Sequence, residues 1–502
     1  MALLTGAVSG ATEVGGLIGY NFGYGSVANS YATGSVTGTG SVAGGLIGLN
    51  ASAASITNSF SAGIVSGSAS TQGGLVGSNA GTVTGSFWDV TTSGQIASAA
   101  GIGMTTAQMQ NQTNFTSATS ANGNVNPGWD FLGTWVIYSG HTYPLLTSFL
   151  TPLVVTANSG SVTYDGASQA GALGVSYSVT PNANLLGTVS YASTPGDAVN
   201  VGNYVVTPGG LYSNQQGYNI SYASGNLSID QLASVTWTGG KTGNWSNAAN
   251  WAGGAIPDYA NVAAVTIPKG TTVTYDSGVI GPTVLTSLND SGILVMAAGN
   301  LSTTGSLSAA GYQQTGGVLS VGGTLSVISS AGSVVLGDID AAAVSITSKA
   351  GPITQLADTV IDVSGTTALA ADSGRVPYAI TLAQAGDSFG GTVTAGGSAI
   401  TLEDAAALTA VLDSTGASTL TSVGAMTVSG AVGTTLKTTT TGTDAATTFG
   451  ATTVGTNLTV TSTGAVTETS ANILEVDGEG TTTVRNVHVT VNGVRGAKIS
   501  AP

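Results

Sequence analysis

The hydrophobic positions of the first ninety residues recur with a fixed period. The run Gly15-Gly16-Leu17-Ile18-Gly19 returns as Gly44-Gly45-Leu46-Ile47-Gly48 and again as Gly73-Gly74-Leu75-Val76-Gly77, which is a constant 29-residue period. Between these runs lie Ser, Thr, Val, Ala and Gly, without the apolar stripe of an amphipathic helix. Such a period indicates stacked β-coils, and the leucines of successive runs are expected to lie over one another inside them. The repeat positions are Gly15, Leu17, Gly44, Leu46, Gly73 and Leu75.

A second marker keeps the same period. Asn29-Ser30-Tyr31 returns as Asn58-Ser59-Phe60 and then degrades to Gly85-Ser86-Phe87-Trp88-Asp89. The residues between the markers have high β-propensity or are small and polar, and the glycines are expected where the backbone turns tightly. Residues 1–90 are therefore predicted to form a β-solenoid.

Aromatic residues gather where the period is lost, in residues 91–150. Large apolar rings can close an exposed interior, so this segment is predicted to cover the open end of the stack of coils. Within it, Thr105 to Gln110 is expected to form a short helix with Thr105 as N-cap. The tryptophans assigned to this cap are Trp88, Trp129 and Trp135.

Two segments with different residue patterns follow in residues 151–284. Residues 151–232 alternate short strands with turn signals, which predicts a small β-sandwich. Residues 233–284 contain the other three tryptophans and are predicted to cap the start of a second solenoid. The alternative for these rings is a ligand-binding aromatic patch. They are Trp237, Trp245 and Trp251.

Short aliphatic strands recur from residue 285 to residue 502. Val344-Ser-Ile346 repeats the pattern of Leu325-Ser-Val327, and Ile400-Thr-Leu402 repeats that of Ile380-Thr-Leu382. Coils of about 20 residues each would give a parallel β-helix of ten or eleven coils. Its inside should hold Val, Ile, Leu and Ala, and its corners Asp, Asn and Gly. The predicted fold class of the whole chain is all-β.

Composition excludes several classes of protein. The chain has 502 residues, of which 6% are charged and 42% hydrophobic, and 76 are glycine. Its apolar runs are too short to span a bilayer as helices, which needs about 20 residues, and its regular aliphatic positions argue against disorder. Cysteine is absent, which suits an exported bacterial protein and is compatible with the cytosol as well. The first residues lack the features of a signal peptide. If the protein is exported, this sequence is therefore expected to be a fragment of a longer precursor whose start is missing.

The net charge of −15 reflects a shortage of bases. Only eight residues are Lys or Arg, and none precedes Lys241. Such a surface cannot neutralise phosphates, so neither nucleic acids nor anionic membranes are expected partners.

Several motifs resemble those of bacterial surface proteins. The 29-residue runs are similar to the GLUG motif, and the aromatic segment resembles the one that follows such repeats. Tyr164-Asp165-Gly166 and Gly202-Asn203-Tyr204 resemble the MBG or YDG-type module. The pattern Trp237-Thr-Gly-Gly-x-x-Gly-Asn-Trp245 is similar to the start of autotransporter passengers, and residues 285–502 resemble filamentous-haemagglutinin repeats.

These resemblances imply a right-handed parallel β-helix and a non-enzymatic adhesin secreted by Gram-negative bacteria. They imply export through an outer-membrane transporter, by a two-partner or autotransporter route. The protein would then act at the cell surface in adhesion or biofilm formation. Its expected partners are glycans or proteins of host or neighbouring cells, and no cofactor is expected.

A search for catalytic groups finds weak candidates. His141 and His488 lack metal-ligand spacing, and no serine stands in a nucleophile motif with its partners. The carboxylate pairs Asp338/Asp340 and Glu403/Asp404 could serve a polysaccharide-processing β-helix enzyme, but no Lys or Arg accompanies them locally. The chain is therefore expected not to be an enzyme.

Two binding hypotheses remain, and for each a purely structural role of the same residues is the alternative. Glu475, Asp477 and Glu479 would share one face of a strand and could hold calcium, although a solvated turn is favoured. The threonine tracts 438–441 and 481–483 could present hydroxyls to ice or a glycan, although threonine is also simply a good strand residue. A further alternative for the whole chain is a structural filament subunit, which exposed coil edges would favour and end caps would block.

Overall fold

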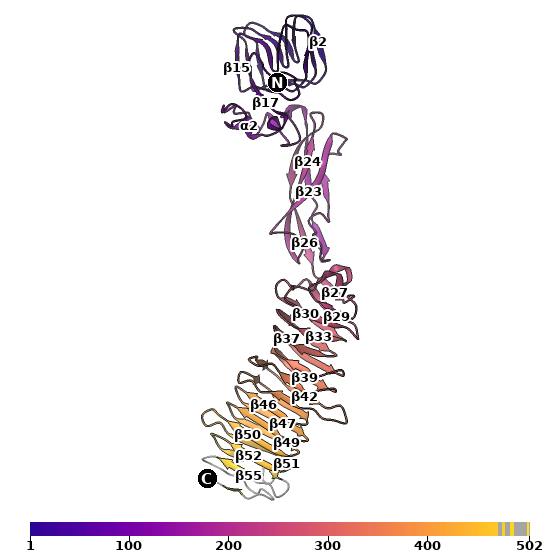
Figure 1. Cartoon of the computed structure of the whole chain (residues 1–502), viewed down its shortest axis with the longest axis vertical. Coiled ribbons are helices and arrows are strands. Elements are labelled where there is room, and N and C mark those ends of the chain that lie inside the picture. The colour runs from indigo at the N-terminus through magenta and orange to yellow at the C-terminus, as the bar shows by residue number, and fades with distance from the viewer. Residues whose placement is uncertain (470–473, 477–481, 486–498, 501–502) are drawn as a thin grey trace. The chain divides into compact units, whose positions relative to one another are not determined.

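The computed structural model describes residues 1–469, 474–476, 482–485 and 499–500. Figure 1 shows that strands make up most of the chain. The chain forms two compact units. The first comprises Met1–Ser159, Ala170–Gly196 and Val205–Asn226, and the second Gly160–Gln169, Asp197–Tyr204 and Leu227–Pro502. Almost all regular structure is β-strand with extensive parallel pairing, so the predicted all-β solenoid fold is confirmed. No helix in the described ranges has both the length and the apolar character needed to cross a membrane.

The first unit begins with a solenoid of five short strands per coil. Equivalent strands of successive coils pair in parallel, so every wall of the coil continues as a small sheet. The first wall contains β1 (Ala2–Leu4), β6 (Ser30–Ala32), β11 (Phe60–Ser61), β16 (Phe87–Asp89) and β17 (Ile102–Met104). The second contains β2 (Val8–Gly10), β7 (Val36–Gly38) and β12 (Val65–Gly67), and the third β3 (Glu13–Gly15), β8 (Val42–Gly44) and β13 (Thr71–Gly73). The fourth contains β4 (Ile18–Asn21), β9 (Ile47–Asn50) and β14 (Val76–Asn79), and the fifth β5 (Ser26–Ala28), β10 (Ser55–Thr57) and β15 (Thr82–Thr84).

The repeated leucines lie in register. The backbone N–H of Leu17 donates to the carbonyl of Leu46 at 2.9 Å, and Leu46 N–H donates to Leu75 at 2.8 Å. Leu46 and Leu75 are fully buried in one apolar cluster, and Leu17 of the first coil packs against it while partly buried. The glycines before them are needed for close approach, since a Cβ on Gly15 or Gly44 would overlap a backbone carbonyl oxygen. Gly73 is constrained in the same way.

The second marker forms a left-handed corner. Asn29 and Asn58 have φ values of 48° and 45°, and Gly85, at the same corner of the third repeat, has φ of 54°. Asn and Gly are the residues that tolerate this region, so the degraded third marker keeps the same backbone.

Asparagines form a ladder inside the solenoid. The Nδ2 of Asn21 donates to the Oδ1 of Asn50 at 2.9 Å, and the Nδ2 of Asn50 donates to Asn79 at 2.8 Å. Asn50 is fully buried, so each amide satisfies the next one along the stack. Sequence reasoning missed this ladder although the 29-residue spacing of the three asparagines reveals it.

The segment after the solenoid contains short helices and a small sheet. Helix α1 (Thr106–Met109) is followed by α2 (Thr113–Thr116), and Thr105 caps α1 in a capping box with Gln108. Strands β18 (Trp135–Val136) and β19 (Leu145–Leu146) pair antiparallel before the 3₁₀ turn η1 (Thr147–Phe149). The predicted short helix with Thr105 as N-cap is present.

The end of the solenoid is closed differently from the expected aromatic cap. The backbone of the third coil bonds to residues 93–99: Gly74 N–H donates to Ala97, and Leu75 N–H donates to the Ser98 hydroxyl. Trp88 packs beside Leu75 in the interior of the last coil. Backbone and hydroxyl groups of a polar loop therefore satisfy the strand edge.

Trp129 and Trp135 lie on the flank of the solenoid instead. Along β6 and β11 the side chains alternate, so Tyr31 and Phe60 point outward while their neighbours point inward. The Trp135 ring lies 6.4 Å from Tyr31 and 6.2 Å from Phe60, which belong to successive coils. Because these two tryptophans contact several coils at once, they cover the first wall from outside, which corrects the prediction of an end cap.

Strands of the predicted sandwich module follow. In the first unit, β20 (Thr151–Ala157) lies between β22 (Val175–Tyr177) and β25 (Tyr218–Ala223). Strand β23 (Leu185–Thr194) pairs antiparallel with β24 (Gly202–Ser213), and β21 (Gly160–Thr163) pairs in parallel with β26 (Gly225–Asp230). Strands β24 and β26 each contain residues of both units. The division between the two compact units therefore falls within residues 151–232, which were predicted as one module.

The second unit is a parallel β-helix with two long sheets. One contains β27 (Leu232–Thr236), β29 (Val262–Ile267), β31 (Thr283–Leu285), β32 (Ser287–Asp290), β34 (Asn300–Thr303), β35 (Leu307–Ala309), β37 (Val318–Ser329), β39 (Asp338–Ser348), β41 (Ile361–Val363), β42 (Thr367–Ala371), β44 (Ser388–Phe389), β45 (Thr392–Gly397), β47 (Leu408–Ser414), β49 (Met426–Val432), β51 (Thr447–Val454), β53 (Val466–Glu468) and β54 (Leu474–Val476). The other contains β28 (Thr242–Asn244), β30 (Thr272–Tyr275), β33 (Ile293–Met296), β36 (Tyr312–Gln314), β38 (Val334–Leu336), β40 (Ile353–Gln355), β43 (Ile380–Leu382), β46 (Ile400–Asp404), β48 (Ser418–Ser422), β50 (Thr435–Thr440), β52 (Asn457–Thr461), β55 (Thr482–Arg485) and β56 (Ile499–Ser500).

Aliphatic side chains stack through this β-helix. Ile353, Ile380 and Ile400 occupy one register position in three successive coils, and all are buried. The β-helix starts before the predicted residue 285, because β27 to β30 already belong to its two sheets. The Trp-rich segment thus supplies the first coils, together with the 3₁₀ turns η2 (Ala248–Asn250) and η3 (Ala252–Gly254).

Candidate binding surface on the first coil

All six tryptophans are buried and therefore unavailable to a ligand. In the second unit, the Trp245 ring contacts Trp251 edge-on at 4.8 Å, and Trp251 contacts Trp237 in the same way at 5.1 Å. The Trp245 Nε1–H donates to Pro257 O at 2.9 Å, and the Trp251 Nε1–H donates to Trp245 O at 2.7 Å. These indoles are packed core groups rather than an open aromatic patch.

The carboxylate pairs do not form a catalytic arrangement. Asp404 is buried inside the β-helix and accepts the backbone N–H of Ala406, whereas its neighbour Glu403 points to the other face of the strand. Asp338 accepts the N–H of Val360, and exposed Asp340 lies in register with Asp362 of the next coil. Among the residues that the structure describes, no three His, Cys, Asp or Glu side chains come together to hold a metal.

The remaining predicted site residues give no cluster. Glu475 is exposed on β54, while Asp477, Glu479 and His488 lie outside the described residues. The calcium hypothesis therefore has only one of its three residues in the described part. His141 stacks on Tyr212 with ring centroids 4.3 Å apart, which is a packing contact.

The threonine tract 438–441 is not a flat outward array. Thr438 and Thr440 point into the β-helix and are buried, while Thr439 points outward, because side chains alternate along β50. Thr440 donates to the carbonyl of Ala445 at 2.8 Å. The alternative of an outward hydroxyl array therefore fails for half of this tract, and residue 481 of the second tract lies outside the described residues.

Asp290 is a buried carboxyl group at a corner of the β-helix. Its Oδ1 accepts the N–H of Gly292 at 2.6 Å, and its Oδ2 has no hydrogen-bond partner within the described residues. Loss of solvation on burial raises the pKa of Asp290 to about 7, although the bond from Gly292 acts in the opposite direction. The same cause raises the pKa of Asp387 and of Asp404.

The Asp290→Asn variant should change how stability depends on pH. A carboxyl group with a raised folded-state pKa stabilises the fold fully below its unfolded pKa, near 4, and this contribution is lost as pH rises to about 7. The variant should therefore gain up to about 4 kcal/mol at pH 8, and almost nothing at pH 4, since three pKa units correspond to roughly that energy. Denaturant unfolding at both pH values measures the difference, with exposed Asp340→Asn as control. Equal effects of Asp290→Asn at pH 4 and pH 8 would contradict this account.

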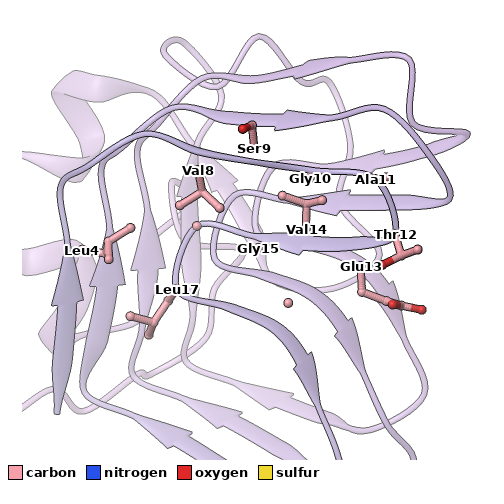
Figure 2. A pocket seen from close by; sticks show the side chains of 12 residues that line it. Leu4, Val8, Ser9, Gly10, Ala11, Thr12, Glu13, Val14, Gly15 and Leu17 are labelled. Carbon is pink, nitrogen blue, oxygen red and sulfur yellow. The ribbon is translucent and has the colours of Figure 1, made fainter.

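The first coil carries a pocket of about 300 Å³. Strands β2 and β3 line it, and Figure 2 shows the side chains of Val8 and Val14 directed into the same space while Glu13 points away. Within the described residues the strands of the first coil pair with those of the second coil. The pocket offers apolar groups and backbone, but no pair of titratable groups for catalysis.

Exposed aromatic rings lie on the fourth wall of the same coil and on the turn that follows it. Tyr20, Phe22 and Tyr24 are 48%, 72% and 93% exposed. The rings of Tyr20 and Phe22 meet at 62° with centroids 5.4 Å apart. This group, called here the aromatic turn, is an exposed aromatic cluster that a ligand could reach, and sequence reasoning did not single it out.

Comparisons with known proteins match two parts of the chain. The GLUG motif matches residues 10–37, which run from β2 to β7 and make one coil. A family described as repeats of unknown function (DUF5649) matches residues 322–396, within the β-helix. GLUG repeats indicate an extracellular repeat protein. The comparisons with curated proteins and with solved structures each find no match.

Proposed function

We propose that this chain is a non-enzymatic adhesin segment at the surface of a Gram-negative bacterium. In this proposal it resembles filamentous haemagglutinins in role, is exported through an outer-membrane transporter, and attaches to glycans or proteins of host or neighbouring cells. The observation that carries the proposal is the GLUG match on a coil of a stacked β-solenoid, in which Glu13 is the one charged side chain of residues 1–88.

The composition of the surface supports attachment rather than chemistry. Solenoids present extended faces built from many similar coils, which suits contact with large partners. Catalysis of polysaccharide cleavage would need acidic and basic groups together in a groove. Of the candidate carboxylates, Asp404 instead faces the interior and Asp340 stands on an outer strand face.

A filament subunit is the second candidate. Coils of separate chains would then have to stack end to end through unpaired strand edges. The end of the solenoid at the third coil argues against such stacking, because residues 93–99 already bond to its strand edge. Light scattering of the intact chain over a wide concentration range distinguishes an adhesin from a filament subunit. The particle mass of a filament subunit should increase with concentration, whereas that of an adhesin should not.

Attachment is tested by coating beads with the full chain and counting those retained on bacterial and epithelial cells. Folded chain should retain beads, and heat-unfolded chain should not. A parallel assay on uronic-acid polymers should release neither reducing ends nor unsaturated sugars. Release that disappears in Asp338→Asn or Glu403→Gln would instead establish an enzyme, and bead retention no better than that of unfolded chain would reject attachment.

A further inference from the structure

The aromatic turn is absent from the other coils of the same solenoid, so the fold does not need it. Tyr20 lies in register with Leu49 of the second coil, and the positions of Phe22 and Tyr24 correspond to Ala51 and Ala53. The turn itself is shared: Gly25 N–H donates to Phe22 O at 3.1 Å, and Ala54 N–H donates to Ala51 O at 3.0 Å. The second coil thus builds the equivalent turn without any aromatic ring.

Hydrogen bonds to an asparagine side chain inside the solenoid hold the backbone of the turn in place. The Nδ2 of Asn21 donates to Gly25 O at 3.4 Å and to Asn50 Oδ1 at 2.9 Å, so the turn rests on the interior asparagine ladder. Gly23 adopts φ of 61°, which permits the tight turn between the two outermost rings. A ligand would therefore meet rings whose backbone is already ordered, and binding would lose little entropy.

The surroundings select an uncharged ligand. Glu13 is the one charged side chain in residues 1–88, and the first basic residue of the chain is Lys241. Anionic glycans, phosphates and anionic lipids would find no counter-charge there. Serine, threonine and backbone groups supply most of the polar contacts that this part of the chain can offer.

We propose that the aromatic turn binds neutral glycans by stacking pyranose rings on Tyr20, Phe22 and Tyr24. The C–H face of a pyranose is apolar and slightly positive, which matches the negative face of an aromatic ring. The 62° angle between Tyr20 and Phe22 gives two walls for one sugar, and exposed Tyr24 gives a separate face for another. This inference rests on the proposed function, for which it names the ligand class.

A protein or a membrane fits these observations less well. A stable protein interface buries about 800 Å² on each partner, which exceeds what three side chains on one turn supply. Membrane binding by exposed aromatic residues usually draws on nearby Lys and Arg for anionic lipid, and no basic residue precedes Lys241.

The test replaces the three rings with the residues of the next coil. The full chain and the variant Tyr20→Leu/Phe22→Ala/Tyr24→Ala are titrated with six-sugar oligomers of β-1,4-glucose, α-1,4-glucose and β-1,4-galactose, and with phosphatidylcholine vesicles. The control variant Ile64→Ala/Ile96→Ala/Leu132→Ala removes three other exposed apolar side chains of the first unit. The wild type and the control should bind at least one oligomer, and the aromatic-turn variant should bind it about tenfold more weakly or worse.

Three results would overturn the inference: no binding of any oligomer by the wild type, equal binding by the aromatic-turn variant, or vesicle binding that only this variant loses. Circular dichroism should show unchanged folding, because all three rings are exposed. If the variant keeps its oligomer affinity while beads still attach to cells, the inference fails and the proposed function stands. If the aromatic turn binds the oligomers but no beads attach to cells, the inference stands and the proposed function fails.

Discussion

The Leu46→Asp variant should lose the folded solenoid of the first unit. Leu46 is fully buried between Leu17 and Leu75, and an aspartate there would place a carboxylate in an apolar stack without a partner. Loss of the leucine side chain alone costs about 2–5 kcal/mol, and burial of an unpaired charge adds to this. The sum is comparable with the whole stability of a typical domain, about 5–15 kcal/mol.

Hydrogen exchange of the full chain measures this effect coil by coil. Because each coil is stabilised by its neighbours, β4, β9 and β14 should lose protection together. The matched control is Ile64→Asp, which introduces the same charge at a side chain that is 51% exposed, and it should leave protection unchanged. Wild-type protection in Leu46→Asp would show that the stacked leucines do not hold the coils together.

The Trp135→Ala variant should destabilise the flank of the solenoid by about 3–5 kcal/mol, the usual cost of removing a buried tryptophan. Trp135 is fully buried and packs on Tyr31, Phe60 and Trp129. Since its contacts reach two successive coils, exchange protection should fall in both β6 and β11.

The strands that lose protection show whether Trp135 packs on the first wall of the solenoid or covers its end. An end cap would protect mainly the last coil, so exchange confined to β16 and β17 would contradict the packing of Trp135 on the flank. Leu132→Ala is the control, because Leu132 lies in the same segment with its side chain fully exposed. Its unfolding curve should match that of the wild type.

The buried polar groups show where reasoning from sequence stopped short. Asp and Asn were expected at the corners of the β-helix around an aliphatic interior, yet Asp290 and Asp404 are buried in it, and Asn50 is buried in the first solenoid. Asn79 satisfies the amide of Asn50, whereas Gly292 bonds to only one of the two carboxylate oxygens of Asp290. Composition cannot reveal such a partner, although the exact recurrence of Asn21, Asn50 and Asn79 does.

The aromatic turn was likewise not predicted from the sequence. The predicted ligand candidates were carboxylates and threonines, whose faces depend on the register of each strand, and as an alternative Trp237, Trp245 and Trp251, which are buried. The aromatic turn differs from the second coil at only a few positions, and its exposure could not be read from residue type, since aromatic residues are more often buried. Comparing the repeats with one another would have shown that Ala51 and Ala53 replace Phe22 and Tyr24.

The sequence by itself determined the coil stacking and the all-β fold. The fixed 29-residue period brings Leu17, Leu46 and Leu75 to one position per coil, and pairing between adjacent coils then follows from hydrogen bonding alone. Only the tertiary structure decided where the large rings go. Trp135 covers a flank because Tyr31 and Phe60, which lie much earlier in the chain, fold against it, and no local pattern encodes those contacts. Tyr24 stands in solvent because no such segment of the described chain folds over its turn.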